Sequence, residues 1–149
     1  MTLKQKIYNH YLQVIHDKIA MFQKTLADLK ESGANETKST AGDKHETALA
    51  MLQIEQANTR EQLHEAQQLL TALEKINPLL SPPVIVPGSL IKTNQGYLFL
   101  SIAGGKAIID GCRVLALSPQ SPLGKLLLQA GSGQTVSISQ HTYHIESIE

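Results

Sequence analysis

The sequence predicts an α+β protein in which a long helical hairpin precedes a small β-rich domain. Residues 2–30 and 43–76 contain neither proline nor glycine. In the first of these segments apolar residues recur every three or four positions, which is the spacing of one helix face. Beyond residue 77 the pattern changes to short β-like runs separated by turn residues. Helices followed by strands, without alternation, are typical of an α+β fold.

Each of the two helical segments has an apolar stripe. The first stripe consists of Leu3, Ile7, Tyr11, Ile15, Ile19, Phe22, Leu26 and Leu29, and the second of Ala48, Leu52, Leu63, Ala66, Leu70, Leu73 and Ile76. A helix of about 30 residues is roughly 45 Å long and cannot bury such a stripe alone. We therefore predict an antiparallel coiled-coil hairpin over residues 1–77, joined by a polar link over residues 31–42, with its tip at about residues 31–47.

Prolines mark the start of the second domain, residues 78–149. Four of them lie between Pro78 and Pro87, and helix cannot continue through them. Strands are predicted over residues 89–93, 97–102, 113–117, 135–139 and 142–148, with a hairpin turn at residues 94–96. One short helix is predicted over residues 122–129, because Ser121 suits the N-cap and Pro122 the first helical position.

Composition and motifs exclude several classes of function. Thirteen basic residues balance thirteen acidic ones, so no net charge favours nucleic acid. We find no signal peptide and no stretch of about 20 apolar residues, so we expect a cytoplasmic protein without a membrane span. Gly104-Gly105-Lys106 is interpreted as a turn because it lacks the spacing of a phosphate loop. No serine stands in a nucleophile motif, and the six histidines show no metal-ligand spacing, so an enzyme with its own substrate is not predicted.

The most informative stretch is AGDKHETA, residues 41–48, at the expected tip. It has two interpretations. Asp43 can cap the second helix while Glu46, three residues later, reaches back to the cap, as in a capping box. Alternatively, two carboxylates at the end of a slender hairpin could reach a deep channel of another protein. There they could complete the coordination of a Mg²⁺ ion and orient a water for attack on a phosphodiester.

Two stretches also resemble a known family. Residues 42–48, GDKHETA, are similar to a tip pattern Gly-Asp-Leu-Arg-Glu-Asn-Ala, with Lys44, His45 and Thr47 in place of Leu, Arg and Asn. Residues 121–128, SPLGKLLL, followed by Gly131, Gly133 and the ending YHIESI, are similar to a second pattern of the same family. That family is the Gre transcript-cleavage factors of bacterial RNA polymerase, and the resemblance covers nearly the whole chain in order.

The resemblance implies a fold and a function. The fold would be an N-terminal coiled coil with an FKBP-like C-terminal domain, which docks at the mouth of the polymerase's secondary channel. Asp43 and Glu46 would help to bind the second Mg²⁺, held by the polymerase, and activate water for cleavage of backtracked RNA. Ser121, Pro122, Leu123 and Gly124 would contact the partner.

On this interpretation the protein is an accessory factor, monomeric and not itself an enzyme. Its partner is RNA polymerase, and it acts on the nascent RNA 3′ end only indirectly. Two alternatives remain open. The protein could be a Gre-shaped regulator that occupies the channel and inhibits without cleavage. It could also be a protein-interaction adaptor whose tip acids are only helix caps.

Overall fold

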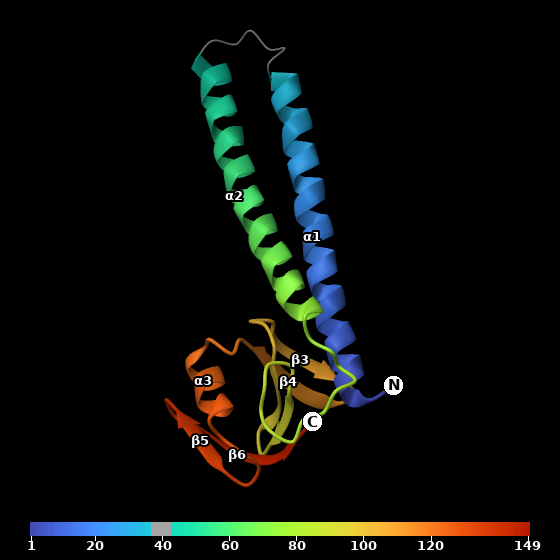
Figure 1. Ribbon diagram of the computed structural model, residues 1–149. Coiled ribbons are helices and arrows are strands. Elements are labelled where there is room, and N and C mark those ends of the chain that lie inside the picture. The colour runs from blue at the N-terminus through green and yellow to red at the C-terminus, as the bar shows by residue number, and fades with distance from the viewer. Residues whose placement is uncertain (37–42) are drawn as a thin grey trace. The chain divides into compact units, whose positions relative to one another are not determined.

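The α+β class is confirmed by the computed structural model, which describes residues 1–36 and 43–149, and their side chains except those of residues 36 and 43–45 (Figure 1). Two helices come first, α1 (Leu3–Glu36) and α2 (Asp43–Glu74). A mixed sheet follows, made of β1 (Leu90–Thr93), β2 (Gly96–Leu100), β3 (Gly105–Ile109), β4 (Cys112–Leu117), β5 (Thr135–Ile138) and β6 (His141–Ile148). A short helix, α3 (Pro122–Leu128), connects β4 to β5.

The first helix is longer than the sequence predicts. We expect it to end near Lys30, but α1 continues through Gly33 to Glu36. A glycine inside a helix costs only about 1 kcal/mol, and no proline interrupts this segment, so helix propagation overrides the turn-like composition. The start of α2 at Asp43 agrees with the expected start of the second helix.

The described residues form two compact units. One is Val14–Leu70, and the other combines Met1–Gln13 with Thr71–Glu149. The first turns of α1 and the last turn of α2 therefore belong to the unit that contains the sheet. The boundary predicted at residue 77 follows the change in secondary structure instead.

Within the unit Val14–Leu70, the helical segments run in opposite directions and bury the predicted stripes in part (Figure 1). Ile15 and Ala66 are buried. The other stripe positions in this unit are half-buried: Ile19, Phe22, Leu26, Leu29, Ala48, Leu52, Leu63 and Leu70. Outside the stripes, Met21 and Ile54 are mainly exposed. The exposure pattern therefore follows the helical period read from the sequence.

The six strands are ordered β3-β4-β2-β1-β6-β5. β2 and β4 pair in parallel, and the other neighbours are antiparallel. The predicted hairpin between the first two strands is confirmed, but its turn consists of Asn94 and Gln95 alone, because Gly96 already pairs with Thr93. β3 is not among the strands that the sequence predicts, and it pairs with β4 through the turn Asp110-Gly111. Both turn residues have positive φ, 51° and 74°, as a two-residue hairpin requires.

The sheet buries side chains on both faces. Along β2, Leu98 and Leu100 lie on the face that α3 covers and belong to one apolar cluster with Leu123 and Leu127. Because side chains alternate along a strand, Phe99 lies on the opposite face. There it contacts Tyr11 of α1, with ring centroids 6.3 Å apart. This second face explains why the first turns of α1 belong to the sheet unit.

Three polar contacts hold the first turns of α1 to this unit. The Tyr11 hydroxyl donates to the Gly105 carbonyl at 2.7 Å, and Lys6 forms an ion pair with Asp110 at 2.6 Å. Lys4 is buried, and its Nζ donates to the Leu80 carbonyl at 2.6 Å. Burial lowers the pKa of the Lys4 ammonium, and attraction by Glu149 opposes that shift.

Candidate functional site

The predicted tip acids lie at the start of α2. Asp43 is the first residue of the helix, but its side chain is outside the part that the structure describes. Glu46 follows three residues later, in the same helical turn, and its side chain is exposed. The two acids therefore begin one helix, as the sequence predicts. Capping by Asp43 and metal binding by either acid both stay predictions.

A magnesium ion bound by Asp43 and Glu46 alone would keep further coordination positions open. Mg²⁺ prefers near-octahedral oxygen coordination, and one or two carboxylates fill only part of it. Among the residues whose side chains are described, no group of three or more His, Cys, Asp or Glu side chains is close enough to hold a metal. The accessible carboxylate of Glu46 fits an ion that is shared with a partner.

The predicted partner-binding residues form the start of α3. Ser121 is the N-cap, with extended backbone, and its Oγ accepts from the Gly124 N–H at 3.0 Å. Leu123 and Gly124 are buried, and a Cβ on Gly124 would lie 2.1 Å from the Ser118 carbonyl oxygen. Only Ser121 and Pro122 reach the surface, so these two could contact a partner directly. Contact by all four residues stays a prediction.

The segment Gly104-Gly105-Lys106 forms no phosphate loop. Gly104 precedes β3, and its backbone lies against the ring of Tyr11 and the methyl group of Ala116. The Gly105 carbonyl accepts from Tyr11. The two glycines therefore serve the packing of α1 on the sheet, and Lys106 is already part of β3.

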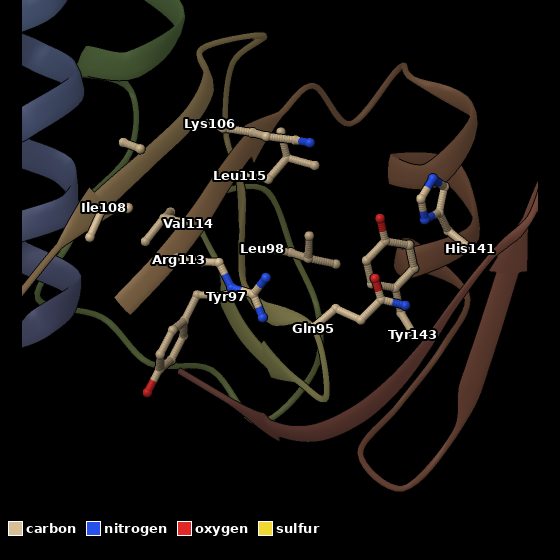
Figure 2. Close-up of a pocket in the computed structure, with 11 residues that line it drawn as sticks. Gln95, Tyr97, Leu98, Lys106, Ile108, Arg113, Val114, Leu115, His141 and Tyr143 are labelled. Atoms are coloured by element: carbon tan, nitrogen blue, oxygen red, sulfur yellow. The ribbon is translucent and has the colours of Figure 1, made fainter. Parts of the chain in front are cut away.

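A groove that the sequence does not predict lies on the face of the sheet that α3 also covers. Its volume is about 600 Å³, and it contains the side chains of Lys106, Arg113, Leu98, Leu115, His141 and Tyr143 (Figure 2). The turn Asp110-Gly111 could have revealed the part of it that β3 and β4 form. A hairpin at that turn predicts strands on both sides, which pairs residues 106 and 115 and residues 108 and 113.

Comparison with solved structures gives a structural likeness. A solved structure titled "Structure of the transcription factor Gfh1" aligns with 95% of this chain and 92% of its own, at 17% identity and a TM-score of 0.32. A likeness at this level identifies neither a family nor an activity. No model of a known protein family matches the sequence, and no curated protein does. None of the described helices has an apolar stretch long enough to span a membrane.

Proposed function

We propose that this protein binds bacterial RNA polymerase through the secondary channel and stimulates cleavage of backtracked RNA. The observation behind this proposal is the position of the acidic pair. Asp43 opens α2, Glu46 follows in the same turn, and the Glu46 carboxylate is exposed. The resemblance of residues 42–48 and of the C-terminal segments to Gre factors supplies the class of partner.

The two long helices suit delivery of these acids into a narrow space. The 32 residues of α2 span about 48 Å as a helix, at 1.5 Å per residue. In the unit Val14–Leu70 the apolar stripes are partly buried, so packing supports the helices along this length. A supported helix start limits the positions that the Glu46 side chain can reach.

The role of this chain would be to position oxygen ligands. Asp43 and Glu46 would supply carboxylate oxygens to a Mg²⁺ ion that the polymerase also holds. That ion would activate a water molecule for attack on the RNA phosphodiester. Since the remaining ligands and the RNA belong to the polymerase complex, the protein would be an accessory factor of the cytoplasmic transcription machinery and not an enzyme.

A cleavage assay on a purified, backtracked elongation complex with Mg²⁺ tests this function. The test variant is Asp43→Asn/Glu46→Gln. The matched control is Asp28→Asn/Glu31→Gln, which removes the same two residue types at the same spacing from an exposed part of α1. We expect short 3′ RNA fragments to be released at least 100-fold more slowly with the test variant, while the wild type and the control act alike.

Polymerase binding by the same proteins separates the alternatives. Intact binding without cleavage by the wild type would indicate a regulator that occupies the channel. Cleavage by the test variant at the wild-type rate would exclude a role for the tip acids. Absence of polymerase binding by all proteins would contradict the proposed partner.

A further inference from the structure

We infer that the groove on the α3 side of the sheet is a binding site for a small organic anion, a carboxylate or phosphate attached to an apolar body. This inference does not depend on the proposed function. All residues of the groove belong to the unit that contains the sheet. Its volume of about 600 Å³ lies in the range of small-molecule sites.

Strand register explains how the groove combines charge with apolar surface. Lys106 of β3 is opposite Leu115 of β4, which is opposite Leu98 of β2. Paired residues lie on the same face, so these three form a row across the sheet. Ile108 of β3 is opposite Arg113 of β4, and this second pair lies beside that row. The floor is therefore leucine, with Lys106 at the β3 end of the row and Arg113 beside the row.

The opposite side of the groove is held in place by hydrogen bonds. Gln95 Nε2 donates to the Thr142 carbonyl at 2.6 Å, and Asn94 Oδ1 accepts from the His144 N–H at 2.7 Å. These contacts tie the β1–β2 turn to β6, which brings His141 and Tyr143 to the rim. Figure 2 shows the Gln95 amide and the Arg113 guanidinium on either side of one open space, with Tyr143 beside Gln95.

The electrostatics of the groove select a negative ligand. Lys106 and Arg113 are exposed, and neither forms an ion pair or side-chain hydrogen bond within the described part of the chain. None of the described residues that line the groove is acidic. Arginine binds carboxylate and phosphate through two parallel N–H donors, and lysine adds a second positive charge.

The apolar part of the ligand follows from Ile108. This side chain is 73% exposed and lies on the same face as the half-buried Leu115 of the neighbouring strand β4. A ligand that covered Ile108 while its anionic group met Arg113 would remove apolar surface from water at the same time. A bare inorganic anion would gain nothing from Ile108, Leu98 or Leu115.

An NMR titration of the ¹⁵N-labelled full chain with phenyl phosphate tests the inference. We expect saturable amide shifts at residues 95–98, 106–108, 113–115 and 141–143. Lys106→Gln/Arg113→Gln should bind at least tenfold more weakly. The matched control Lys75→Gln/Arg60→Gln removes the same residue types from exposed positions outside the groove, and it should bind like the wild type. Unchanged amide dispersion shows that a variant is folded.

Three further probes measure separately how the anionic group and the apolar ring contribute to binding. Inorganic phosphate has the charge alone, phenol has the ring alone, and benzoate replaces phosphate by carboxylate. We expect phenyl phosphate or benzoate to bind at least tenfold more tightly than either partial probe, and the better of the two identifies the anion. Equal binding by inorganic phosphate would overturn the inference. So would absence of saturable groove shifts, or equal binding by Lys106→Gln/Arg113→Gln.

Discussion

The ring of Tyr11 occupies the space in which any side chain at position 104 would begin. A Cβ built on Gly104 would lie 2.8 Å from Cδ1 and 2.9 Å from Cε1 of Tyr11. The ring has little room to move, because Tyr11 is 1% exposed and lies against Phe99. Its hydroxyl is also fixed by the hydrogen bond to Gly105. Helix α1 and the strand β3 therefore meet at a position that requires glycine.

We expect Gly104→Ala to lower the free energy of unfolding by about 2 kcal/mol, since overpacking a well-filled core costs about 1–3 kcal/mol. Urea denaturation at pH 7 measures the change. Gly131→Ala is the control, because a Cβ there meets nothing within 4 Å and the backbone has no positive φ. An unchanged midpoint for Gly104→Ala would mean that the Tyr11 ring gives way freely.

Tyr11→Phe should lower the free energy of unfolding by about 1 kcal/mol at pH 7, because it removes the hydrogen bond to the Gly105 carbonyl. Burial raises the pKa of the Tyr11 hydroxyl above its ordinary value. The unfolded chain therefore loses this proton first as the pH rises beyond about 10, and the folded state loses stability there. Between pH 8 and pH 10.5, the free energy of unfolding measured by denaturation should fall less for Tyr11→Phe than for the wild type. Tyr97→Phe, at a half-buried tyrosine outside this contact, is the matched control.

Lys4→Met tests a pH dependence of stability that is opposite to that of Tyr11. Because burial lowers the pKa of Lys4, the unfolded chain keeps this proton to a higher pH than the folded chain. Stability of the wild type relative to Lys4→Met should therefore rise between pH 8 and about pH 10, and the titration of the tyrosines cancels in this difference. Lys75→Met, which removes an exposed lysine in the same way, is the matched control. Parallel curves for wild type and Lys4→Met would contradict the shift.

Ser121→Ala and Pro122→Ala should separate stability from partner binding at the start of α3. Loss of the Ser121 cap should cost about 1 kcal/mol in urea denaturation. Pro122 is exposed, so its replacement should change stability by less than about 0.5 kcal/mol. Under the proposed function Pro122→Ala should weaken polymerase binding. Ser81→Ala, at an exposed serine of the linker, is the control for both measurements. Equal polymerase binding by Pro122→Ala and the control would remove Pro122 from the interface.

Much of the fold could be predicted from local patterns. The start of α2 at Asp43, the hairpin between the first two strands and the cap at Ser121 all depend on residues close in sequence, and all appear in the structure. The extension of α1 through Gly33 was missed because composition favours a turn while propagation favours helix. β3 was missed because two glycines dominate its start, although Asp110-Gly111 marks its end.

The groove could not be predicted in the same way. Lys106, Arg113 and Tyr143 come from three separate strands, and only the strand order and register bring them to one face. No local signal reports that β4 pairs in parallel with β2, which sets Leu98 opposite Leu115. The tip acids, in contrast, can be selected from the sequence. The sequence alone selects Asp43 and Glu46, and the structure adds the helical turn that begins with Asp43 and the exposure of Glu46.

The position of β6 in the sheet has a consequence for synthesis of the chain. β6 pairs with β1 on one side and β5 on the other, and Leu90 and Glu149 exchange two backbone hydrogen bonds at 2.8 Å and 2.7 Å. On the ribosome, β1 therefore has β2 as its single neighbour until residues 141–149 have left the exit tunnel. The face of the sheet on which Phe99 contacts Tyr11 also forms long after Tyr11 itself has emerged. Until then, the unit that contains the sheet has a strand with an unpaired edge, so a stalled or truncated nascent chain would be a substrate for chaperones and proteases.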